Sequence, residues 1–92
     1  LQLVLDQVEK AAALVVQALR VDPSSRDAHF ESARIAIRRG RHADAATAAE
    51  KALSFKGGET TDARIHALLA RVYQARGDAE RAARHAAAAR GN

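Results

Sequence analysis

The chain has 92 residues, which is enough for one domain and leaves no room for a second. Apolar residues make up 48% and exclude wholesale disorder, while one Pro and 5 Gly provide too few turns for a many-stranded β fold. There are 15 Lys and Arg against 11 Asp and Glu, a net charge of +4, and the absence of Cys excludes disulfides, thiolate metal sites and cysteine nucleophiles.

Apolar residues recur at helical spacing in five segments that are separated by proline or glycine. The breaks lie at Pro23, Gly40, Gly57-Gly58, Gly77 and Gly91. The spacing predicts helices over 1–21, 25–39, 42–55, 61–76 and 79–90. Short connections make consecutive helices antiparallel, so we expect an all-α fold of five helices arranged in hairpins.

Side chains that cap helix N-termini precede three of the predicted helices. Ser24 or Ser25 precedes the second helix, Thr60 or Thr61 the fourth, and Asp78 the fifth. Their oxygen atoms can accept hydrogen bonds from the free N–H groups of the first helical turn. These signals support the predicted helix starts.

The hairpins repeat along the chain. Sliding the sequence by 37 residues superposes His29, Ala33, Arg34, Arg39 and Gly40 on His66, Ala70, Arg71, Arg76 and Gly77. A shift of 34 superposes Ala11, Ala12, Ala18 and Leu19 on Ala45, Ala46, Ala52 and Leu53. The His, Leu and Arg-Gly matches fall in the same register as the alanine matches, which indicates an internal repeat.

These matches resemble the tetratricopeptide repeats, whose unit is a helix–turn–helix of about 34 residues. Gln17–Pro23 and Glu50–Leu53 look like repeat ends, and Arg39–Ala45 and Arg76–Ala82 look like the turn in the middle of a repeat. The resemblance implies a right-handed superhelical stack of helix hairpins, an α-solenoid. It divides a single domain, 1–92, into a trailing helix (1–23) and two repeats (24–57 and 58–92). We expect such a chain to be part of a longer protein.

The chain departs from the family pattern at the large aromatic positions and at the closing proline. His29 and His66 occupy aromatic positions, and Gly57 replaces the proline. The small residues that allow the helices to approach closely are kept, so the fold implied by the family is unaffected. The departures weaken only the inference that this chain binds the ligand of a particular family member.

In this family the first helix of each hairpin lines the concave side, which here means the second and fourth helices. The resemblance places Asp27 there, together with the residues that we predict to bind a partner: Phe30, Arg34, Ile37, Arg38, Arg64, Arg71 and Gln74. Helical spacing independently places Phe30, Arg34, Ile37 and Arg38 on one stripe.

Arginine suits bidentate capture of carboxylates. We therefore expect a protein-interaction scaffold that holds an acidic partner peptide in a basic groove, with an apolar floor at Phe30 and Ile37. The alternative is that the arginines only keep an alanine-rich helix in solution. The Lys and Asn of the carboxylate-clamp subset are absent from the matching positions, so binding of chaperone C-terminal tails is not implied.

The first helix carries apolar residues on more than one face. One stripe, which includes Val8, Ala12, Val15 and Leu19, should pack on the second helix. A second apolar face predicts another covering partner. Either a second copy of the chain covers it, giving a homodimer, or a preceding helix does so in a longer solenoid. The residues assigned to the self-association surface are Leu1, Leu3, Val4 and Leu14.

Other functions find little support in the sequence. No two of the four histidines stand three or four residues apart on one helix, so no local metal pair is expected, and no catalytic motif or cofactor site is recognised. His29 and His66 are interpreted as half-buried packing residues. Nucleic-acid binding is a less favoured alternative, because the basic residues are interleaved with acidic ones and aromatics are only 3%. No apolar run is long enough for a membrane span, and a cytoplasmic location is favoured.

Overall fold

The computed structural model describes the backbone of residues 2–91 and the side chains of residues 6–91. Five helices make up the described chain, which contains no strand. They are α1 (Gln2–Val21), α2 (Arg26–Arg38), α3 (His42–Ser54), α4 (Asp62–Ala75) and α5 (Ala79–Ala89). The predicted all-α fold is confirmed, and each observed helix lies within its predicted range.

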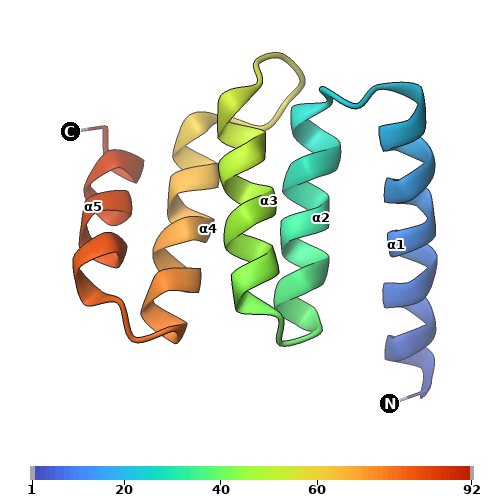
Figure 1. Ribbon diagram of the computed structural model, residues 1–92, viewed down its shortest axis with the longest axis horizontal. Helices are drawn as coiled ribbons and strands as arrows, with labels where there is room; N and C mark the ends of the chain where they lie inside the picture. The colour runs from blue at the N-terminus through green and yellow to red at the C-terminus, as the bar shows by residue number, and fades with distance from the viewer. Residues whose placement is uncertain (1, 92) are drawn as a thin grey trace.

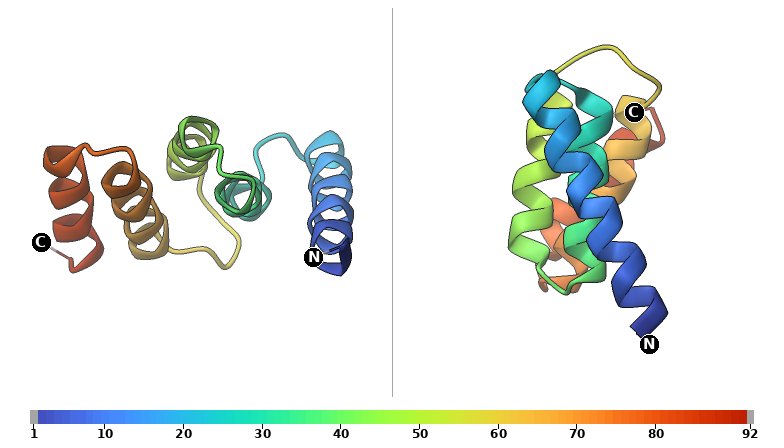
Figure 2. Two further views of the ribbon diagram at one scale, coloured as in Figure 1. Left: turned by 90° about the horizontal axis from the view of Figure 1, so that it is seen from below. Right: turned by 90° about the vertical axis from the view of Figure 1, so that its right-hand side faces the viewer.

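The helices stand side by side in chain order, with the two termini at opposite ends of the row (Figure 1). Viewed along the helices, their axes follow a zigzag, as expected for consecutive antiparallel hairpins (Figure 2). The Cα trace measures 36 × 31 × 17 Å along its principal axes. The molecule is therefore a slab one to two helices thick. None of the described helices is long and apolar enough to cross a membrane.

Three helices begin at the predicted capping residues. Ser25, Thr61 and Asp78 each accept a hydrogen bond from the backbone N–H three residues later. This bond satisfies one of the N–H groups that have no partner in the first helical turn, which fixes where α2, α4 and α5 start.

The core is built from small and branched aliphatic side chains. Ala33, Ala45, Ala49 and Ala52 are fully buried where α2 meets α3. Because alanine projects only a methyl group, the backbones of these two helices can lie close together. Ile65, Leu69 and Val72 from α4 are the largest fully buried side chains and fill the centre of the slab.

The connection between α3 and α4 is held by two side chains from the start of α2. The carboxylate of Asp27 accepts hydrogen bonds from the backbone N–H groups of Glu59 (3.1 Å) and Thr60 (2.9 Å) and from the Thr60 hydroxyl. These bonds, led by the Thr60 hydroxyl, lower the pKa of Asp27 below its ordinary value. Gly58 lies against the Asp27 side chain and has a φ of +72°. A Cβ at this position would lie 2.7 Å from Asp27 Cγ, so the turn requires glycine.

The guanidinium of Arg26 is buried beneath the same connection. It donates to the carbonyl oxygens of Ala52 (3.0 Å) and Thr60 (3.1 Å) and forms an ion pair with Asp62. A third carbonyl, that of Leu53, lies 3.4 Å away. Arg26 therefore joins the first turn of α2 to the end of α3 and the start of α4.

α1 packs on α2 through the predicted stripe and leaves its other side uncovered. Val8 is buried, and Ala12, Val15 and Leu19 line a cavity together with Ile35. Val16 borders the cavity toward α2 and is 50% exposed. On the uncovered side, Leu14 and Val21 are 67% and 87% exposed. Of the residues predicted for self-association, Leu14 lies on this exposed surface. Leu1, and the side chains of Leu3 and Val4, lie outside the described residues.

Candidate functional site

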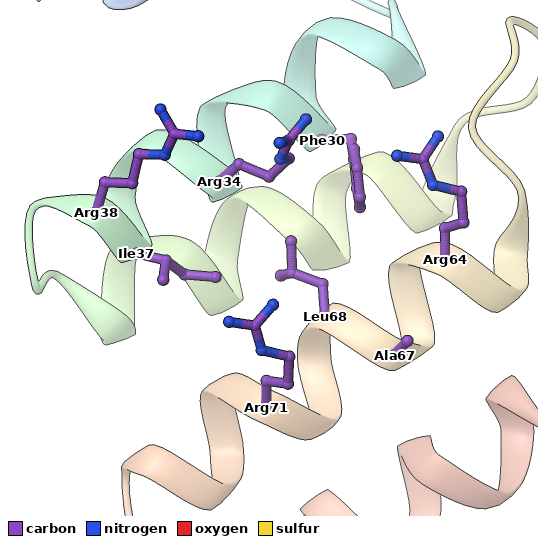
Figure 3. A pocket seen from close by; sticks show the side chains of 8 residues that line it. All are labelled: Phe30, Arg34, Ile37, Arg38, Arg64, Ala67, Leu68 and Arg71. Carbon is purple, nitrogen blue, oxygen red and sulfur yellow. The ribbon is translucent and has the colours of Figure 1, made fainter. Parts of the chain in front are cut away.

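A basic groove runs between α2 and α4 (Figure 3). Its volume is about 450 Å³. The floor is apolar and the rim carries four guanidinium groups. The lining residues are Phe30, Arg34, Ile37 and Arg38 from α2 and Arg64, Ala67, Leu68 and Arg71 from α4.

The helical repeat explains why these side chains share one face. On α4, residues 64, 67, 68 and 71 follow the i, i+3, i+4, i+7 pattern, while Ile65, Leu69 and Val72 point into the core. On α2, Ala33 and Ala36 are buried in the core, which leaves the stripe from Phe30 to Arg38 for the groove. The antiparallel hairpins bring these two stripes together.

The structure brings together six of the seven residues predicted for partner binding. Gln74 instead lines a separate cavity between α4 and α5, beside Ala70 and Ala82. Asp27, which the resemblance placed on the concave side, is engaged with the backbone of residues 59 and 60. Leu68 was not predicted for the groove, although its position four residues after Arg64 is a signal that could have found it.

The four arginines of the groove differ in how strongly they are engaged. Arg34 pairs with Glu31 at 2.6 Å on the helix surface, and both side chains are 45% exposed. The Arg64 guanidinium lies over the Phe30 ring, 5.0 Å from its centroid, as in a cation–π contact. Arg38 and Arg71 are exposed and form no ion pair with any described residue. No Asp or Glu lines the groove, so an anion would first meet Arg38 and Arg71.

A second polar cluster lies between α4 and α5. His66 and His85 are hydrogen-bonded through their Nδ1 atoms, 2.9 Å apart, and the His85 ring stacks on Tyr73 with centroids 5.6 Å apart. The Tyr73 hydroxyl donates to Glu50 at 2.8 Å. Nineteen residues separate the two histidines, so helical spacing could not reveal this pair.

His29 and His66 occupy equivalent repeat positions but have different surroundings. His29 is buried, bonds through Nε2 to the Pro23 carbonyl oxygen at 2.8 Å and stacks on Phe55. This agrees with a packing role. His66 is half-buried and open to the cavity beside Tyr73. Among the described residues, no group of three or more His, Cys, Asp or Glu side chains could together hold a metal ion.

The His66–His85 pair predicts an acid-sensitive stability. Burial, followed by the positive charge of His66, lowers the pKa of His85 below its ordinary value of 6.5, while Glu50 partly opposes this. The unfolded chain therefore binds the proton more tightly than the folded chain, so stability is lost as pH falls through 6.5. We expect the urea midpoint to decrease between pH 7.5 and 5.5.

The variant His85→Ala isolates this effect, because it keeps the other histidines and has high helix propensity. Its urea midpoint should vary less with pH over the same range than that of the unchanged protein. Equal pH profiles for the two proteins would contradict the prediction.

Comparison with known proteins identifies one family. A family model for the tetratricopeptide repeat matches residues 1–64, which cover α1, α2, α3 and the start of α4. The comparisons with curated proteins and with solved structures give no match.

Proposed function

The chain belongs to the tetratricopeptide repeat family, whose repeats generally serve as scaffolds for protein–protein interaction, and from this premise we propose that the groove between α2 and α4 binds an acidic segment of a partner protein. We keep the repeat limits as part of the proposal: 1–23 as a trailing helix, then 24–57 and 58–92 as two repeats. No step of the proposed function requires a cofactor.

The observation that carries the proposal is the charge of the groove lining. Four arginines and no acidic residue line the groove. Hydrogen bonds between guanidinium and carboxylate are about twice as strong as those between neutral groups, and the planar guanidinium can hold both carboxylate oxygens. Arg38, Arg64 and Arg71 form no ion pair with a described residue, and of these Arg64 is engaged with the Phe30 ring. Binding a carboxylate at Arg38 and Arg71 therefore breaks neither an ion pair nor a cation–π contact.

The floor adds a second requirement on the partner. Phe30, Ile37 and Leu68 offer apolar surface beneath the arginines. A partner that alternates or interleaves Glu with Leu would satisfy both the rim and the floor. We therefore expect a segment of mixed acidic and apolar side chains rather than a uniformly acidic one.

Charge reversal at the two free arginines tests this proposal. We expect Arg38→Glu/Arg71→Glu to weaken binding of a fluorescent peptide rich in Glu and Leu by at least about 100-fold. The estimate assigns about 1.5–3 kcal/mol to each lost charge-assisted bond. Fluorescence anisotropy at constant ionic strength measures the affinity, because salt screens exposed charges.

The matched control is Arg20→Glu/Arg41→Glu, which changes the net charge equally at exposed positions outside the groove. It should retain most of the affinity. An equal loss in both double variants would show that only the net charge matters and would contradict a groove site.

Self-association through α1 is the second candidate function. It is favoured by the exposure of Leu14, Val16 and Val21 on one helix. Burying such apolar side chains between two copies would contribute about 25 cal/mol for each Å² removed from water, before the cost of association. This candidate predicts a dimer mass by light scattering at about 100 μM protein, and a monomer for Leu14→Lys/Val21→Lys. A monomeric unchanged protein at that concentration would reject it.

A further inference from the structure

We propose that His66 and His85 form a binding site for a divalent transition-metal ion such as Ni²⁺, held between α4 and α5. Imidazole nitrogen is a preferred ligand of Ni²⁺, Cu²⁺ and Zn²⁺. The two Nδ1 atoms lie 2.9 Å apart on different helices. The site is separate from the α2–α4 groove, and none of its residues lines that groove.

The separation of the two nitrogens fits ligands on one ion. Two nitrogens about 2.1 Å from a metal lie about 3.0 Å apart when the two bonds are perpendicular, and about 3.4 Å apart in a tetrahedron. The observed 2.9 Å is close to the perpendicular arrangement, which occurs in the square-planar and octahedral complexes typical of Ni²⁺ and Cu²⁺.

The two histidines can also adopt the tautomers that metal binding requires. In two neutral rings joined through Nδ1, one ring donates its Nδ1 proton and the other accepts it. When the ion binds both Nδ1 atoms, the donating ring takes its proton at Nε2 instead, by exchange with water. Neither Nε2 atom forms a hydrogen bond with a described residue, so this change of tautomer costs no internal bond.

The surroundings leave room for the ion and its water ligands. A cavity of about 370 Å³ opens beside the pair and is lined by Glu50, Tyr73, Arg81 and Arg84. Glu50 from α3 contributes negative charge. The two arginines of α5 oppose a cation, but Arg84 is paired with Glu80 and Arg81 with Asp78, at 3.5 Å for the latter.

The ion would also link α5 to α4. In α5, Ala82 is the buried residue, and His85 is hydrogen-bonded to His66 of α4. A metal bound to both histidines binds the folded chain more tightly than the unfolded one, so it raises the unfolding temperature. The stabilisation therefore provides a readout that is independent of any partner.

Titration of tag-free protein with NiCl₂ at pH 7.5, followed by calorimetry and by thermal unfolding, tests the proposal. We expect one Ni²⁺ per chain and a rise in unfolding temperature. His66→Ala and His85→Ala should each weaken binding by more than the about 10- to 100-fold that removal of an outer-shell partner costs. His42→Ala, which removes a histidine from the start of α3, should leave binding unchanged, and MgCl₂ should give no shift.

Nitrogen NMR of the imidazoles distinguishes this site from nonspecific binding, because bound Ni²⁺, which is paramagnetic in octahedral complexes, should broaden the Nδ1 resonances of both His66 and His85. The absence of Ni²⁺ binding by the unchanged protein would overturn the proposal. Binding that persists in the double variant His66→Ala/His85→Ala, or that His42→Ala abolishes, would also overturn it.

Discussion

Replacing Arg26 by Ala is expected to lower the free energy of unfolding by about 3–5 kcal/mol, a large part of the about 5–15 kcal/mol typical of a domain. Arg26 is 8% exposed, and its guanidinium donates to the carbonyl oxygens of Ala52 and Thr60 and pairs with Asp62. Alanine would remove the donor to the Thr60 carbonyl and one of two donors to the Ala52 carbonyl, which also accepts from the Phe55 N–H. It would also detach the start of α2 from the connection between α3 and α4.

Urea unfolding followed by circular dichroism measures this loss. Arg26→Lys should recover only part of it, because an ammonium cannot reach several acceptors from one planar group. Arg38→Ala is the control for removing an exposed arginine, and it should change stability by less than about 0.5 kcal/mol. Equal effects at positions 26 and 38 would show that the buried guanidinium does not hold the connection.

Leu69→Ala is expected to cost about 3–5 kcal/mol, because Leu69 is fully buried in the centre of the slab. Much of the surrounding core is alanine, including the fully buried Ala45 and Ala49. Such short side chains cannot move into the space left by a leucine. The cavity should therefore persist, and the cost should lie toward the upper end of the range.

Leu14→Ala makes the same chemical change at a position that is 67% exposed. In monomeric protein it should alter the unfolding free energy by less than about 0.5 kcal/mol. Thermal and urea unfolding of the two variants at low protein concentration separates burial from residue type. A large loss for Leu14→Ala under these conditions would mean that its side chain is covered.

The helices were predictable because their signals are local. Periodic apolar residues, the caps at Ser25, Thr61 and Asp78, and the glycines between segments all act within a few residues of the helix ends that they determine. The register of the internal repeat also predicted which helices pair into hairpins. This pairing also explains how Arg34 and Arg71, 37 residues apart, were expected on one face and line the same groove.

The features that were not predicted depend on contacts between distant segments. Arg26 bonds to groups 26, 34 and 36 residues away, so nothing in its neighbourhood distinguishes it from the exposed arginines. The His66–His85 pair likewise arises only when α5 is placed on α4. Gln74 was expected in the groove from the family resemblance, but it lies near the end of α4, where the cavity toward α5 begins.

The shortest dimension of the Cα trace is 17 Å, which leaves no room for a layer of side chains between the groove and the core. Phe30 and Leu68 belong to both, since each is 6% exposed, packs in the hydrophobic core and lines the groove. Recognition and folding therefore draw on the same atoms. A ligand bound in the groove should stabilise the whole chain against unfolding. Conversely, any change in the shape of the core should change the affinity of the groove for that ligand.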